Sequence, residues 1–183
     1  MPRIVLATFF FLAMALPAAA QSATATARLG PGQTVTVTAV KASGESARLE
    51  IATPSGTQRF DGIGEQFLTM KSGGKDSIIV VADLNGDGID EIIVRGSVTS
   101  DASAVIVYQW DGARREYLPL DFTADNQDEG KPFLFVDAAS TVTIVRPGTI
   151  EVSATRTDQS GRTNTVVERY RWDGDGFKYV ADN

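Results

Sequence analysis

Residues 77–94 constrain the fold more than any other stretch, because two short apolar runs enclose a polar loop. Residues 78–82 lead into the loop, and residues 92–94 leave it. Runs this short and this rich in β-branched residues are typical of buried strands. The sequence therefore predicts two strands joined by a loop that carries most of the polar chemistry.

The loop spaces its oxygen-bearing side chains in the way that a hard cation requires. These side chains belong to Asp83, Asn85, Asp87 and Glu91. Calcium takes about 6–8 oxygen ligands, from carboxylates, amides, backbone carbonyls and water. We expect these four side chains and the backbone carbonyl of Ile89 to bind one Ca²⁺, with Asp90 facing solvent. An acidic hairpin turn is the alternative interpretation, because Asn-Gly and Asp-Gly pairs are common in turns.

The same residues carry a family resemblance. The segment D-L-N-G-D-G-I-D-E, residues 83–91, resembles the calcium loop of FG-GAP/VCBS-type repeats. The resemblance implies a bound calcium ion and two antiparallel strands of a propeller blade or a blade-like sheet. The family pattern usually ends in Asp, where this chain has Glu91. An EF-hand is not expected, because the residue at loop position twelve would be Val94 and the flanks are strand-like.

The N-terminus has the features of a secretory signal, which we place at residues 1–20. Arg3 supplies the positive charge, residues 4–16 the apolar core, and Ala18 to Ala20 a small-residue cleavage site. The apolar run is too short for a membrane span, and nothing later in the sequence supplies one. The chain contains no Cys, so a disulfide framework is excluded. We expect a protein exported to the periplasm or secreted, with no transmembrane segment after cleavage.

Composition limits the chemistry that is available. The formal net charge is −6, which argues against nucleic acid as a partner. The absence of His and Cys removes the common nucleophile and zinc systems. A carboxylate pair, as in glycoside hydrolases, is the remaining catalytic option. Because the densest carboxylates are better explained as calcium ligands, we do not expect an enzyme.

The rest of the sequence predicts one all-β domain at residues 33–183, preceded by a flexible lead-in at residues 21–32. Short alternating runs recur with Gly and Asp turns between them, and almost no segment has a helical period. We expect residues 95–103 to be a polar loop and residues 121–131 to be an acidic linker. The predicted architecture is an antiparallel β-sandwich or a partial, propeller-like stack of sheets.

An internal repeat indicates two related β units, at about residues 77–120 and 140–181. The motif Tyr-x-Trp-Asp-Gly begins at Tyr108 and recurs at Tyr170. Only the first unit has the calcium loop. We expect Trp110 and Trp172 to point into the core, although an exposed aromatic binding platform is the alternative.

These observations favour an exported, non-catalytic binding module that calcium stabilises. Small proteins of this kind are similar to periplasmic lysozyme inhibitors, so a muramidase is one expected partner. Residues 72–75 and residues 95–103 are the two candidate inserting loops. A structural or adhesive module of the cell envelope is the alternative function, and a carboxylate-dependent glycan hydrolase is a third. The sequence thus favours a protein or cell-envelope partner.

The export hypothesis makes a direct prediction. Cleavage after Ala20 should leave Gln21 as the first residue of the protein isolated from the periplasm or the medium. Mass spectrometry of the N-terminal peptide checks this. Recovery of the intact Met1 form from the soluble cytoplasmic fraction would contradict it.

Overall fold

The computed structural model describes residues 20–123, 130–145, 148–158 and 160–180. These residues form strands and turns, with no helix among them, so the prediction of an all-β fold is confirmed. Consequently, no described residue belongs to a helix that could span a bilayer. The expected signal sequence, apart from Ala20, and part of the expected acidic linker lie outside the described residues.

Sheet A is an antiparallel meander of four strands in chain order. These strands are β1 (Gln21–Gly30), β2 (Gln33–Lys41), β3 (Ala47–Thr53) and β4 (Gly56–Gly64). The expected flexible lead-in is therefore wrong, since residues 21–30 pair with β2 along their whole length. The inward residues of β1 include Ala23, Ala25 and Ala27, which pack at the core. Because alanine is only weakly hydrophobic, the alternation of alanine with polar residues in β1 does not clearly predict a strand.

Sheet B contains the two strands that the sequence predicts around the polar loop. Its strands are β7 (Ile79–Ala82), β8 (Glu91–Ser97), β9 (Ala102–Asp111), β10 (Glu116–Pro119) and β12 (Leu134–Asp137). All of its pairings are antiparallel, and both β10 and β12 pair with β9. The prediction of a polar loop at residues 95–103 is wrong, because β8 continues through Ser97. Only residues 98–101 lie between the paired strands.

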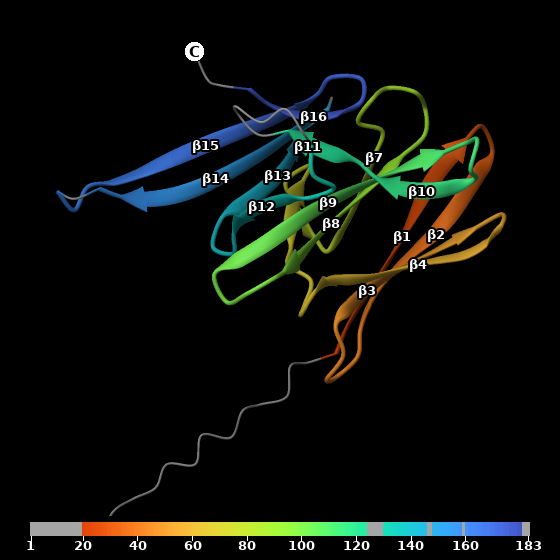
Figure 1. Cartoon of the computed structure of the whole chain (residues 1–183), viewed down its shortest axis with the longest axis horizontal. Coiled ribbons are helices and arrows are strands. Elements are labelled where there is room, and N and C mark those ends of the chain that lie inside the picture. The colour runs from red at the N-terminus through yellow and green to blue at the C-terminus, as the bar shows by residue number, and fades with distance from the viewer. Residues whose placement is uncertain (1–19, 124–129, 146–147, 159, 181–183) are drawn as a thin grey trace, which may run out of the picture.

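Sheet C is mixed and has seven strands. In spatial order they are β11 (Asp121–Thr123), β16 (Gly176–Val180), β15 (Thr163–Trp172), β14 (Thr149–Thr157), β13 (Thr141–Val145), β5 (Met70–Ser72) and β6 (Lys75–Ser77). The β11–β16 and β13–β5 pairs are parallel, and the others are antiparallel. The long β14–β15 hairpin extends to the left of the other strands in Figure 1.

Sheet B contributes one face to each of two hydrophobic clusters. Ile93, together with Val80 and Val105, packs with residues of sheet C. Its neighbours Ile92 and Val94 pack with residues of sheet A. A strand buried on both faces reads as a continuous apolar run, which accounts for the unbroken segment at residues 92–94.

Sheets A and B also meet backbone to backbone at the ends of β4 and β8. The amide of Glu65 donates to the Ser97 carbonyl at 2.8 Å, and the Ser97 amide donates to the Gln66 carbonyl at 2.9 Å. A Cβ at Gly96 would lie 1.8 Å from the carbonyl oxygen of Ile63. Glycine is therefore required at this crossing by the closeness of the two chains.

A Gly96→Ala substitution should destabilise the protein by about 1–3 kcal/mol, because the backbones must separate to admit the methyl group. Gly112→Ala is the matched control. A Cβ there would approach only the Trp110 ring nitrogen, at 3.9 Å. Urea denaturation of both variants measures the difference. Equal midpoints for the two variants would contradict the close approach.

Candidate functional site

The polar loop joins β7 to β8, and its side chains hold its own backbone. The carboxylate of Asp83 accepts hydrogen bonds from the amides of Gly86 at 2.7 Å and Gly88 at 3.0 Å. The carboxylate of Asp87 accepts one from the Ile89 amide at 2.7 Å. These bonds fold the chain tightly around its acidic side chains, and Gly86 and Gly88 adopt positive φ.

Glu91 closes the loop from the first position of β8 and is only 1% exposed. Its carboxylate accepts hydrogen bonds from the Leu84 amide at 2.6 Å and from the Asn85 side-chain amide at 3.1 Å. Burial raises the pKa of Glu91 from 4.5 to about 7. The Leu84 hydrogen bond opposes this rise, and the charges of Asp87 and Asp83 add to it.

The predicted side-chain ligands Asp83, Asn85, Asp87 and Glu91 all lie in this loop. The carboxylates among them accept hydrogen bonds from N–H groups of the loop itself. The Asn85 amide nitrogen lies 3.1 Å from an oxygen of Asp87 and 3.1 Å from an oxygen of Glu91. In the described part of the chain, no three acidic side chains converge as a group that could hold a metal ion. Nor does any described Lys or Arg lie within 4 Å of Asp83, Asp87 or Glu91.

Asp90 does not face solvent, so that prediction is wrong. It is 7% exposed and forms an ion pair with Arg28 of β1, with 2.6 Å between Nη2 and Oδ1. The Arg28 amide donates to Asp90 Oδ2 at 2.8 Å, and the Asp90 amide donates to the Arg28 carbonyl at 2.9 Å. The hydrogen bonds with Asp90 raise the pKa of Arg28. Asp90 thus attaches the loop to sheet A, a role that sequence position alone could not indicate.

A buried tyrosine lies beneath the loop. Tyr117 of β10 is 0% exposed, and its hydroxyl has no hydrogen-bond partner among the described residues. Burial raises its pKa, and the charges of Asp90 and Glu91 raise it further. The side-chain amide of Gln58 holds the Tyr117 backbone, accepting from its N–H at 2.7 Å and donating to its carbonyl at 3.3 Å. The electrostatic effect of Asp90 and Glu91 is therefore felt by a tyrosine in the core between sheets A and B.

The two aromatic motifs lie in different sheets and are packed differently. Trp110 and Trp172 are half-buried rather than fully inward. The ring of Trp110 meets Tyr117 edge-on, with 5.4 Å between centroids. Tyr117 pairs with Trp110, but Tyr179 pairs with Tyr170. The strand register of the two hairpins thus differs, despite their shared motif.

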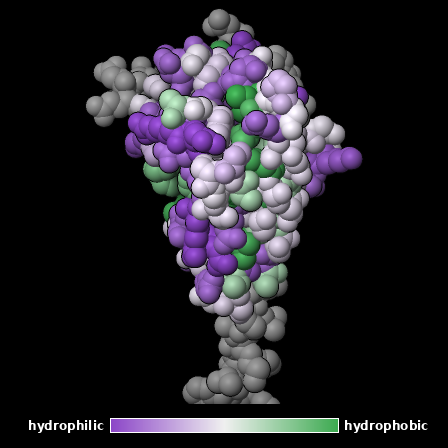
Figure 2. Space-filling model, turned by 90° about the vertical axis from the view of Figure 1, so that its right-hand side faces the viewer, coloured by the Kyte–Doolittle hydropathy of each residue, from purple (hydrophilic) through white to green (hydrophobic). Residues whose placement is uncertain are grey.

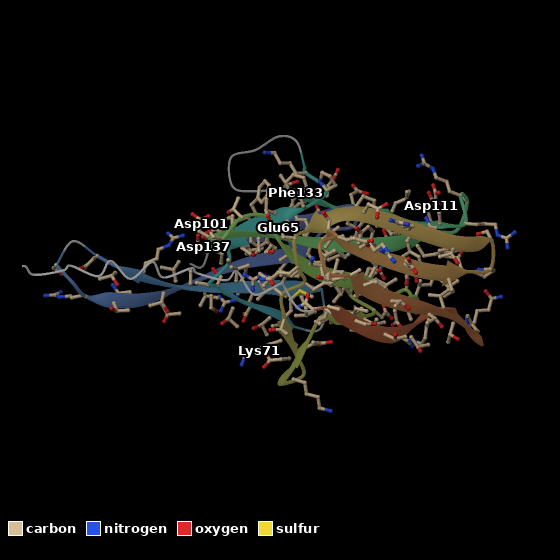
Figure 3. All side chains as sticks on the ribbon, turned by 90° about the horizontal axis from the view of Figure 1, so that it is seen from below. Glu65, Lys71, Asp101, Asp111, Phe133 and Asp137 are labelled. Atoms are coloured by element: carbon tan, nitrogen blue, oxygen red, sulfur yellow. The ribbon has the colours of Figure 1, made fainter. Side chains whose placement is uncertain are left out.

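Of the two candidate inserting loops, residues 72–75 lie at the exposed end of the β5–β6 hairpin, which projects from the sheets in Figure 3. Gly73 and Gly74 have φ of 56° and 78°, as in the tight turns that suit two-residue hairpins. Lys71 and Lys75 are both exposed on it. The other candidate begins with Arg95, which is buried in β8 and 3% exposed.

Few large hydrophobic side chains are exposed in the described part of the chain. In the described ranges, the exposed large hydrophobic residues are Val98, Phe135 and Val145. Figure 2 shows a narrow hydrophobic strip bordered by hydrophilic residues at the end that carries the turns of sheet A.

Comparison of the chain with family models found no match. Comparisons with curated proteins and with solved structures also found no significant match.

The Asp90 contact predicts a large effect from a residue outside the expected ligand set. Asp90→Ala should destabilise the protein by about 2 kcal/mol, because it removes the acceptor of several hydrogen bonds in a buried place. Asp61→Ala, which removes the exposed Arg59–Asp61 pair, is the control and should change stability little. Thermal melts compare the two. A shift no larger for Asp90→Ala than for the control would contradict the assigned contact.

Proposed function

We propose that this chain is an exported, non-catalytic binding module whose β7–β8 loop binds Ca²⁺ as a structural ion. The supporting observation is that three acidic side chains of one loop, which do not converge on a common point in this structure, have no described cationic side chain within ion-pair distance. One of the three, Glu91, is buried. Like charges repel, and burial disfavours the charged form of a carboxylate. A divalent cation bound in the loop would offset both costs.

The donor set suits calcium in its chemistry. Asp83, Asn85, Asp87 and Glu91 would supply side-chain oxygens, and Ile89 its backbone carbonyl. Because a carboxylate oxygen has two lone pairs, it can accept a backbone hydrogen bond and still bind an ion. Binding requires the side chains to exchange part of their present contacts, above all the Asn85 bridge between Asp87 and Glu91. This donor set, with the strands on either side, is what the chain shares with FG-GAP/VCBS-type loops.

Calcium in this loop would stabilise more than the loop itself. Asp90 lies within it and binds Arg28 of β1, and Glu91 begins the central strand β8. An ion that orders residues 83–91 would therefore strengthen the contact between sheets A and B. The proposed role is that of a staple, with no part in catalysis.

Calcium should raise the melting temperature of the protein, and a chelator should lower it. A ligand that binds only the folded state stabilises it by about 2.7 kcal/mol at a hundredfold excess over Kd. Magnesium should act less, because it prefers a tighter octahedral shell and loses its waters reluctantly. Differential scanning calorimetry in chelator, calcium and magnesium measures the three states.

Two variants locate the effect. Asp87→Ala should abolish the calcium response, whereas Asp175→Ala should retain it. Asp175 is an exposed acid in the Asp173–Gly176 turn of sheet C, and so controls for loss of a surface carboxylate. Equal melting curves in chelator and in calcium would leave residues 83–91 as an acidic turn.

A second candidate function is inhibition of a muramidase, favoured by the projecting β5–β6 hairpin. The hairpin is narrow, carries Lys71 and Lys75, and has a two-glycine turn at its end. The active sites of glycosidases contain paired carboxylates, which would attract a basic, slender insert. The resemblance to periplasmic lysozyme inhibitors inferred from the sequence points the same way, although their inserting loop often carries a Tyr that residues 72–76 lack.

A lysis assay separates this candidate from an adhesive role. An inhibitor should block a muramidase at equimolar amounts, and Lys75→Glu should weaken the block by reversing a charge at the tip. Glu45→Lys, on a distant exposed turn of sheet A, is the charge-reversal control. Binding to envelope material without any effect on lysis would favour the adhesive module instead.

A further inference from the structure

Arg95 of β8 is a buried cation that the calcium proposal does not use. It is 3% exposed. Its Nε donates to Ser103 Oγ at 2.9 Å, and its Nη1 to the Ser140 carbonyl at 2.8 Å. Its Nη2 donates to the carbonyls of Asp137 at 2.8 Å and Ala138 at 3.1 Å. The guanidinium thus binds four neutral oxygens, three of them carbonyls at the turn between β12 and β13 and the fourth the Ser103 hydroxyl of β9.

These contacts leave the charge of Arg95 without a described carboxylate partner. No ion pair within 4 Å joins it to another residue of the described ranges. A guanidinium has five N–H groups, and one on Nη1 makes no hydrogen bond to these residues. Burial lowers the pKa of Arg95. A buried charge of this kind is costly unless an opposite charge approaches it.

A surface depression of about 210 Å³ opens onto Arg95 between β5, β8 and the start of β13. Its lining includes Lys71, a second cation, and the hydroxyl residues Thr69, Ser140 and Thr141. Asp76 is the one acidic residue in this lining, so the two cations leave the wall with a net positive charge. Figure 3 shows Lys71 on the projecting hairpin, beside the body of the sheets.

Ser140 supplies a second hydrogen-bond donor to the depression. The residue is 6% exposed and lines the depression. Its backbone carbonyl accepts from Arg95, and its amide donates to the Asp137 carbonyl at 3.0 Å. Its hydroxyl makes no hydrogen bond to the described residues and is not among their fully buried unsatisfied polar atoms, so solvent in the depression reaches it. This hydroxyl and the unused N–H of Arg95 are two donors at one depression that an acceptor oxygen could share.

We propose that this depression binds an oxyanion group, a carboxylate or a phosphate, of a small or larger ligand. One ligand oxygen accepts from Arg95 Nη1 and the Ser140 hydroxyl. Lys71 neutralises the group from the open side. The contacts of Arg95 with the β12–β13 turn and with Ser103 of β9 explain four of its donors. It does not explain the fifth donor, the Ser140 hydroxyl or the second cation at the same place.

The test is an NMR titration of ¹⁵N-labelled protein at constant ionic strength. Inorganic phosphate and acetate are the two probes, with chloride as the reference. We expect saturable shifts at the amides of residues 69–71, 95 and 140–141, and at the Arg95 Nε–H. A stronger response to phosphate identifies a phosphate-bearing ligand, and a stronger response to acetate a carboxylate. Either result supports the site.

Variants that leave Arg95 in place keep the test independent of folding. Lys71→Ala should weaken probe binding about two- to fivefold, in line with a partly exposed ion pair. Ser140→Ala should weaken it about two- to tenfold, the value of one hydrogen bond. Lys75→Ala, on the same hairpin but outside the depression, should bind as the unchanged protein does.

The result that overturns the proposal is equally specific. Shifts spread over all basic residues, or equal affinities for Lys71→Ala and Lys75→Ala, would mean general attraction of anions without a site. An absence of saturable shifts at residues 95 and 140 would also refute it. The titration is repeated in chelator, where binding should persist, because none of these residues belongs to the calcium loop. Failure of either proposal therefore leaves the other standing.

Discussion

Strand β8 has no face toward solvent, and the arrangement of the other sheets depends on that constraint. Ile92, Ile93 and Val94 are each completely buried, and full burial of such side chains contributes about 1.5–3 kcal/mol each. Alternate residues must therefore be covered by two different sheets. Sheet A covers one side and sheet C the other. At its far end the strand approaches β4 so closely that only glycine fits at position 96.

The extended backbone of β8 keeps its two buried charged residues, Glu91 and Arg95, from forming an ion pair with each other. Glu91 and Arg95 lie four residues apart, so both point to the same side of the sheet. At about 3.3 Å per residue they are separated by roughly 13 Å. That distance is too long for an ion pair, so each buried charge requires its own compensation. Glu91 accepts hydrogen bonds from Leu84 and Asn85, and Arg95 donates to four neutral oxygens.

The features that the sequence predicts correctly are those determined by residues close together in the chain. The all-β class and the strands around the polar loop follow from short β-branched runs, and the loop's polar residues do lie together. The position of Asp90 could not be predicted, because its partner Arg28 is 62 residues away. Strand β1 was missed because alanine and threonine alternate there with little difference in hydrophobicity. The burial of Arg95 in a strand could not be predicted, because charged side chains usually remain exposed to solvent. Three of its four hydrogen bonds go to carbonyls of a turn more than forty residues later, and a local sequence pattern carries no information about such distant contacts.

The contact between Arg28 and Asp90 also has a consequence for the order in which the chain acquires its structure. It closes a segment of 62 residues that contains most of sheet A. Closing a flexible segment costs entropy that grows with its length, and contacts between distant residues slow folding. The contacts within the hairpins of sheet A are local, so their earlier formation would shorten that segment. The acidic loop would then reach its final position late, after the surface that receives it exists. A chain that has not finished folding would present this loop unattached, with its carboxylates open to the ions around it.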